Sequence, residues 1–170
     1  PGVLLQHGKI LRVVFGTRDK EDFREVLREI AEDLCDSGIE GVLSENIRRD
    51  ALEKFSYVSP IGAAGLYFDA VARDFQREGE PGETFKAMIR EIASLAEAMG
   101  IPFEKDMVEA NLKILSNLAP EATTSMQRDV LAGKNSEIDG LVYEVVRMGG
   151  EYGVPVPVYT KVAEKLRGIK

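Results

Sequence analysis

Lys54 is the residue whose setting best suits acid–base chemistry. It stands directly before the run FSYVSPIGAAGLYF, which contains no charged residue. On a helix, Val58 and Ile61 return to the face of Lys54, so an apolar stripe begins at the lysine. Partial removal of solvent lowers the pKa of a lysine and makes its ammonium a usable proton donor. The alternative is a surface lysine whose stem lies on apolar surface while its ammonium reaches water.

A second group of polar residues lies in the stretch Thr123–Gly140, which reads TTSMQRDVLAGKNSEIDG. Two short helices are expected around its Gly-Lys-Asn turn, with Ser125 at the head of the first and Glu137 at the head of the second. Helix capping and the attraction of acidic groups to a helix N-terminus account for all of these polar residues. The spacing does not show that Ser125, Glu137 and Lys54 converge.

Other common catalytic and metal-binding patterns are absent from the sequence. It has no Gly-rich phosphate loop, no paired cysteines, no His-based metal spacing and no nucleophile elbow. His7 falls in an expected turn, where solvation is the simpler interpretation, and Cys35 lies late in an expected helix, where it fits packing. We therefore expect no metal site.

Composition and charge restrict the class of protein. The chain is 44% hydrophobic and 30% charged, as in an ordinary folded protein, and its net charge of −7 argues against binding nucleic acid or an anionic membrane. Its longest uncharged run, residues 55–68, is shorter than the roughly 20 residues that span a bilayer. A single cysteine fits a reducing compartment. We expect a soluble cytoplasmic protein.

The first 45 residues predict a small α/β piece. Val3–Leu5 and Ile10–Phe15 are rich in Val, Ile and Leu and flank His7-Gly8, which indicates a β-hairpin. A helix should follow from about Asp19 and end at Gly38, and a short strand is possible at Ile39–Leu43. Because a lone hairpin is only marginally stable in water, we favour a chain cut from a longer protein.

From Asn46 onward the apolar spacing is helical throughout. Pro60 should kink the first of these helices. The small residues of Gly62–Gly65 allow either close helix packing or room for a ligand. The sequence thus predicts a mainly α protein whose small piece, residues 1–45, precedes a helical domain, residues 46–170. The expected helices are Asn46–Leu66, Phe85–Met99, Val108–Leu118, one beginning near Ser125, Ile138–Val145 and Val158–Leu166.

The chain resembles the C-terminal helical domain of the ketopantoate reductase family (2-dehydropantoate 2-reductases). The resemblance rests on Ser125-Met126, Asp129, Ser136–Asp139 and Gly153–Pro157, which follow the order and spacing of the family pattern. Upstream, Ala51–Phe55 resembles the family's Trp-x-Lys segment, and the opening PGVLLQHGKILRVVFG is similar to the last strand pair of its nucleotide domain. The resemblance covers essentially the whole chain.

This resemblance implies a helical domain of the 6-phosphogluconate-dehydrogenase-like type, residues 46–170, for substrate binding and dimerisation. Residues 1–45 would be the remnant of a Rossmann domain. It further implies NADPH-dependent reduction of a small 2-keto acid, as in pantothenate biosynthesis, by a cytoplasmic homodimer. Lys54 would donate the proton to the ketone oxygen, Glu137 would lie beside the substrate and Lys54, and Ser125 would bind the polar end of the substrate.

Four positions depart from the family pattern. Val58, Gly62 and Ala122 stand where family members commonly carry Asn, and Leu52 stands in the place of the Trp. A pocket without three amide side chains is less polar, so the substrate can differ from ketopantoate and be bulkier.

The sequence also has no Gly-rich turn to hold the pyrophosphate of a dinucleotide. We therefore expect no cofactor site in this chain and no turnover by the chain alone. The competing hypothesis is a helical dimerisation or interaction module that has no chemistry of its own.

Overall fold

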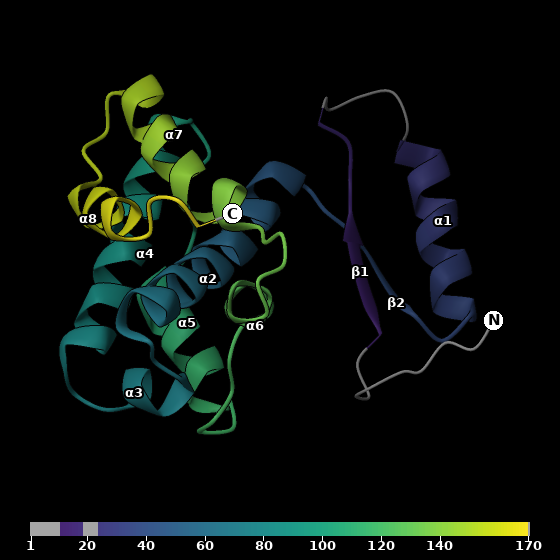
Figure 1. Cartoon of the computed structure of the whole chain (residues 1–170). Helices are drawn as coiled ribbons and strands as arrows, with labels where there is room; N and C mark the ends of the chain where they lie inside the picture. Colours follow the sequence, from purple (N-terminus) through teal and green to yellow (C-terminus); the bar gives the residue numbers. More distant parts are fainter. Residues whose placement is uncertain (1–10, 19–23, 170) are drawn as a thin grey trace. The chain divides into compact units, whose positions relative to one another are not determined.

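In the computed structural model, which describes residues 11–18 and 24–169, the chain divides into two compact units (Figure 1). The first unit is Pro1–Asp50 and the second is Ala51–Lys170.

The first unit is a parallel β-α-β arrangement. Strand β1 (Arg12–Phe15) is followed by helix α1 (Arg24–Asp36) and strand β2 (Glu40–Leu43). The two strands pair in parallel, with Arg12 opposite Glu40. A helical crossover is what parallel neighbours require. Gly38, at φ 79°, takes the left-handed conformation expected after the helix.

The expected hairpin is seen only in part. Its first strand, Val3–Leu5, and His7 lie outside the described residues, as does Asp19. Its second strand is confirmed as β1, but the described partner of β1 is β2, in parallel. The short strand expected at Ile39–Leu43 is thereby confirmed as well.

The second unit is entirely helical among the described residues. The expected helices are confirmed, including the long one that carries Pro60. Helix α3 was not predicted, because five residues are too few to show a helical period. The helices are α2 (Ile47–Phe68, which begins before the second unit), α3 (Ala72–Gln76), α4 (Glu80–Ala98), α5 (Met107–Ser116), α6 (Ser125–Leu131), the π-helical η1 (Asp139–Tyr143), α7 (Glu144–Tyr152) and α8 (Pro157–Lys165).

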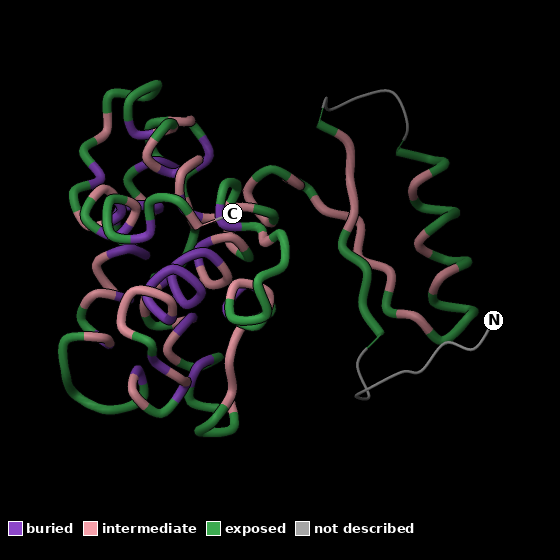
Figure 2. Tube along the Cα trace, viewed as in Figure 1, coloured by how far each residue is buried: buried purple, intermediate pink, exposed green. Residues whose placement is uncertain are grey.

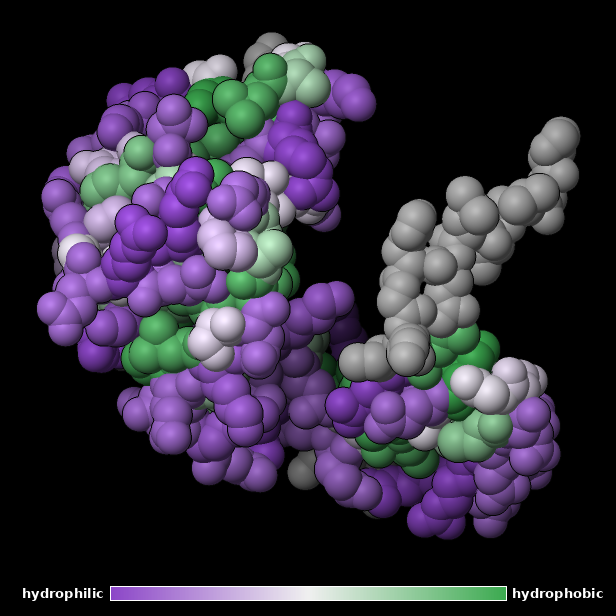
Figure 3. Space-filling view, turned by 90° about the horizontal axis from the view of Figure 1, so that it is seen from below, coloured by the Kyte–Doolittle hydropathy of each residue, from purple (hydrophilic) through white to green (hydrophobic). Residues whose placement is uncertain are grey.

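The hydrophobic core lies in the second unit. Figure 2 shows buried residues gathered in the helical unit, whereas α1 has none. Helix α4 contributes four large apolar side chains to the core, Phe85, Met88, Ile89 and Ile92, all at 0% exposure. In the space-filling view, hydrophobic surface also appears on the first unit, among hydrophilic side chains (Figure 3).

Pro60 is accommodated inside α2 by a side chain from α5. Proline has no N–H, so the carbonyl of Ser56, four residues earlier, loses its helical partner. The buried amide of Asn111 replaces that partner: its Nδ2 donates to the Ser56 carbonyl at 3.0 Å and to Ser56 Oγ at 3.1 Å. The contact fixes α2 against α5 just after Lys54.

The C-terminal segment is held by two buried polar side chains. The Glu91 carboxylate accepts the backbone N–H groups of Val158, at 2.7 Å, and Tyr159, at 3.0 Å, at the start of α8. Burial raises the pKa of Glu91, although these two hydrogen bonds partly oppose the shift. Ser59 of α2 hydrogen-bonds the Tyr159 hydroxyl at 2.6 Å and donates to the Leu141 carbonyl of η1. Helices α2, α4, α8 and η1 are thus joined.

Candidate functional site

A cavity of about 260 Å³ in the helical unit is lined by one of the three predicted site residues, Ser125. Val58 and Ile61 of α2 form one wall, and Phe75 of α3 forms another. The remaining wall comes from the segment before and at the start of α6, including Ala122 and Ser125. Residues about 60 positions apart in the sequence therefore line one space, which the spacing alone did not show.

Lys54 lies on α2 one turn before the cavity wall. It shares a helix face with Val58 and Ile61, about 6 Å along the axis from Val58 at 1.5 Å per residue. Its side chain is exposed, so the expected partial desolvation does not occur within this chain. The residues on both sides of Lys54 are anchored: Glu53 forms an ion pair with Lys105 at 2.6 Å, and Ser56 is bound by Asn111.

Ser125 is the first residue of α6, and its place is fixed by a capping box. Thr124 is the N-cap: its Oγ1 accepts the Gln127 N–H at 3.2 Å, and Gln127 Oε1 accepts the Thr124 N–H at 3.0 Å. Gln127 Nε2 also donates to the Ala70 carbonyl at 2.8 Å. The expected helix cap in this stretch is confirmed at Thr124. Ser125 is exposed and lines the cavity.

Glu137 is not among the residues that line this cavity. It is exposed and lies just before η1, where its carbonyl accepts the Leu141 N–H at 2.9 Å. Ser136 Oγ accepts the Ile138 N–H at a long 3.4 Å, which agrees with the capping interpretation of this segment. In the described structure, Ser125 lines the same cavity as Val58 and Ile61, which share a helix face with Lys54. Glu137 does not line this cavity.

Positions 58, 62 and 122, where family members commonly carry Asn, have different environments. Val58 and Ala122 line the cavity. Gly62 lies against α6, where an added Cβ would come within 2.7 Å of the Met126 methyl group. At Gly65 an added Cβ would come within 2.6 Å of the Gln127 side chain. Of the two interpretations of Gly62–Gly65, close helix packing is therefore the one observed.

Tyr57 is a cavity residue that the sequence did not single out. Its ring packs edge-on against Phe85, with centroids 6.1 Å apart. Its buried hydroxyl has no hydrogen-bond partner among the described residues, and burial raises the pKa of the phenol. Nothing in the local pattern distinguishes it from a core aromatic. Gln127, by contrast, was recognisable from the Thr-x-x-Gln signature of a capping box.

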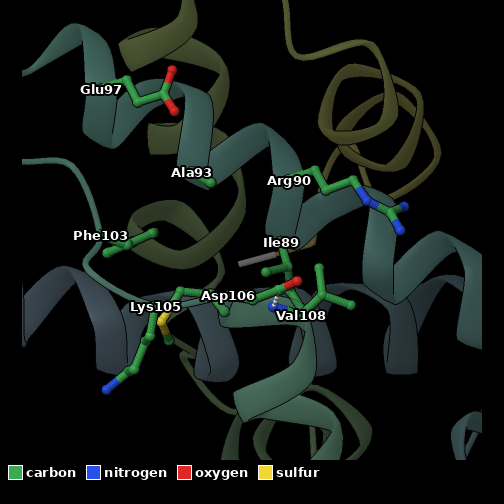
Figure 4. Close-up of a pocket in the computed structure, with 9 residues that line it drawn as sticks. Ile89, Arg90, Ala93, Glu97, Phe103, Lys105, Asp106 and Val108 are labelled. Carbon is green, nitrogen blue, oxygen red and sulfur yellow. Dashed lines mark hydrogen bonds between the residues drawn. The ribbon is translucent and has the colours of Figure 1, made fainter.

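A second cavity, of about 280 Å³, lies between α4 and the start of α5 (Figure 4). None of the predicted site residues lines it. Two of its charged groups already have roles: Lys105 pairs with Glu53, and Asp106 caps α5 by accepting the Val108 N–H at 2.8 Å. Figure 4 shows the charged ends of Arg90 and Lys105 pointing away from each other. The arrangement offers no convergent group for a ligand.

Residues 11–18 and 24–169 contain neither a metal-binding cluster nor a membrane-spanning helix. Among these residues, no group of three or more His, Cys, Asp or Glu side chains is placed to hold a metal ion. No helix within the same ranges combines the length and apolar character needed to cross a membrane.

Comparison with known proteins gives one family match and one curated relative. The family model described as "Ketopantoate reductase PanE/ApbA C terminal" matches residues 46–170. A 2-dehydropantoate 2-reductase of Halobacterium salinarum is 26% identical over 168 residues, which are 98% of this chain and 54% of that protein. The chain thus spans about half the length of this relative.

Solved structures share the fold. The crystal structure of 2-dehydropantoate 2-reductase from Methylococcus capsulatus superposes with a TM-score of 0.82 at 23% identity, over 95% of this chain and 51% of that one. D-mandelate dehydrogenase, solved with NADH and anilino(oxo)acetate, gives 0.79 at 17% identity, over 90% and 64%. A dimeric ketopantoate reductase from Staphylococcus aureus gives 0.76 at 18% identity, over 92% and 53%.

Proposed function

Because the chain belongs to the ketopantoate reductase family through its C-terminal domain, we propose that it is the C-terminal part of a reductase that uses NADPH to convert a 2-keto acid into a 2-hydroxy acid. The observation that carries this proposal is the cavity that Val58 of α2 and Ser125 of α6 line together, with Lys54 on the same helix face one turn away. The nicotinamide would supply the hydride.

In this proposal Lys54 is the proton donor. Reduction of a ketone places negative charge on its oxygen, and a nearby ammonium both stabilises that charge and delivers the proton. The ion pair of Glu53 with Lys105 and the hydrogen bonds of Ser56 to Asn111 fix the backbone on both sides of Lys54. Its exposure leaves the ammonium accessible to a substrate, and a bound substrate would itself exclude water from it.

Ser125 and Glu137 complete the proposed set. The Ser125 hydroxyl lines the cavity on a rigid helix start, and we assign it to the polar end of the substrate. Glu137 is assigned to the substrate side of Lys54, where a carboxylate would keep the lysine protonated. Because Glu137 is exposed and outside the cavity lining, this role requires an approach of its side chain on substrate binding.

The cofactor is assigned to no residue of this chain. The sequence has no Gly-rich turn for the pyrophosphate, so the residues present do not fit NADPH. We propose that the cofactor is bound by the remainder of a two-domain protein, that residues 1–45 are the end of that domain, and that residues 46–170 bind substrate and form a cytoplasmic homodimer. The parallel β-α-β arrangement of the first unit supports a nucleotide-binding origin. The dimeric Staphylococcus aureus relative supports the dimer.

Lys54→Ala in the complete reductase tests the proton-donor role. We expect kcat to fall about 10²- to 10⁴-fold, the usual contribution of a positioned general acid, while the Kd for NADPH stays unchanged. Steady-state kinetics and fluorescence titration with NADPH measure the two quantities. Lys113→Ala, which removes an exposed lysine of α5 that lines neither cavity, is the control and should retain near-normal kcat.

Equal losses of turnover and NADPH affinity would remove Lys54 from this role. Full activity of Lys54→Ala would likewise remove Lys54 from this role. The absence of turnover with any 2-keto acid in the complete protein would instead favour the non-catalytic interaction module. The 170-residue chain alone should not oxidise NADPH at a rate comparable to that of the complete protein.

A further inference from the structure

We infer that the 260 Å³ cavity receives the side chain of the substrate and selects 2-keto acids with a branched or aromatic hydrocarbon side chain over those that carry a hydroxyl. In this inference Val58 and Ala122 are the residues that set the selectivity. The inference rests on the proposed function and names the substrate class of the same site.

The walls of the cavity are largely apolar. Apolar side chains come from three of the segments that border it: Val58 and Ile61 from α2, Phe75 from α3, and Leu118 and Ala122 from the segment before α6. Helix α6 contributes the polar residues Ser125 and Gln127. Binding of a hydrocarbon group against such walls is favourable because it removes apolar surface from water.

Most polar groups on the walls already have partners. Thr124 and Gln127 bond each other in the capping box, and Gln127 also donates to Ala70. The backbone carbonyl of Ala122 accepts the Ala72 N–H at 3.0 Å. Among the described residues of the lining, the Tyr57 hydroxyl is the buried side-chain group left without a partner, so a buried substrate hydroxyl would find this one group to bond. Ser125, which is exposed, remains available for the carboxylate end of a 2-keto acid.

The cavity is also large enough for such a side chain. An apolar protein cavity of about 150 Å³ is large enough to bind benzene, so a space of about 260 Å³ accepts a phenyl ring or a branched alkyl group. At position 62, Met126 fills the space beside the glycine, so an amide is missing there too. Positions 58, 62 and 122, where family members commonly carry Asn, thus provide no amide group. The cavity leaves room beside Val58 and Ala122.

The test compares ketopantoate with its analogue in which a methyl group replaces the hydroxyl, using the complete reductase and NADPH. Hydrophobic pockets discriminate against an added hydroxyl by about 10²-fold. We therefore expect kcat/KM to be about 10- to 100-fold higher for the methyl analogue. Val58→Asn and Ala122→Asn should each lower this preference by about tenfold or more, because an amide can bond the hydroxyl.

Two variants keep the result interpretable. Val108→Asn makes the same substitution in a half-buried residue of the other cavity and should leave the preference unchanged. Val58→Thr retains the side-chain shape and should shift the preference in the same direction as Val58→Asn if the larger change impairs folding.

Equal kcat/KM values, or a preference for ketopantoate, would overturn the inference while the proposed reductase function stands. A preference that survives both Asn variants would remove Val58 and Ala122 from the selective role. Absence of turnover with both acids and with other 2-keto acids would overturn the proposed function and this inference together.

Discussion

The pair Pro60 and Asn111 illustrates how single residues determine the shape of the site. A proline in a helix leaves the carbonyl four residues earlier unbonded, and here Asn111, at 1% exposure, supplies the missing donor to Ser56. Two residues that look unfavourable separately, a proline inside a helix and an amide in the core, thereby become compatible. They hold the part of α2 that lies between Lys54 and the cavity wall.

Asn111→Leu should lower the free energy of unfolding by about 1–3 kcal/mol, the cost of leaving a buried carbonyl unbonded. In a Pro60→Ala background the same change should cost less, because the alanine restores the helical N–H to the Ser56 carbonyl. Urea denaturation followed by circular dichroism measures the double-mutant cycle. Asn135→Leu, in an exposed residue of the turn between α6 and η1, is the control and should change stability by less than about 0.5 kcal/mol. Equal costs in both backgrounds would contradict the explanation.

At the scale of elements, the approach of α6 to α2 forms the cavity. Gly62 and Gly65 let Met126 and Gln127 lie against the α2 backbone, and the capping box fixes where α6 begins. Without this approach, Ser125 and Ala122 would not share a cavity with Val58.

Gly65→Ala should lower the free energy of unfolding by about 1–3 kcal/mol, because the added methyl group meets the Gln127 side chain and overpacks a closed interface. Gly150→Ala, inside α7 with nothing near its added Cβ, is the control and should raise stability by up to about 1 kcal/mol through helix propensity. Thermal unfolding of both variants gives the comparison. A stabilising Gly65→Ala would contradict the close packing of α6 against α2 at this position.

At the scale of the whole molecule, the two units differ in how much they bury. Helix α1 has no buried residue, and the first unit exposes the apolar side chains Val13, Val14, Val26 and Ile30. The second unit contains the hydrophobic core. This difference agrees with our proposal that the first unit is the end of a larger nucleotide-binding domain whose other parts would cover those side chains.

In the 170-residue chain, amide hydrogens of α1 should therefore exchange at least about 10²-fold faster than those of α4, because segments with few buried apolar contacts open at low free-energy cost. Hydrogen–deuterium exchange followed by mass spectrometry of peptides from the two helices measures this. Similar protection of α1 and α4 would indicate that the first unit is as stable as the helical core and would contradict the argument.

The sequence by itself determined the described helices other than α3, the family and the chemistry to look for. The apolar spacing in α4 is strong because that helix packs one face against the core, whereas residues 59–65 of α2 are all buried and lie in a run without charged residues. The Ser125 and Glu137 segments carry the family pattern in local order. Local spacing does not encode contacts between distant segments. Only the tertiary structure decided that Val58, Ala122 and Ser125 share a cavity, that Gly62 is a packing contact, that Lys54 is exposed and that Glu137 lies outside the lining. These outcomes depend on how closely α6 approaches α2, which is set by side chains that meet only after folding.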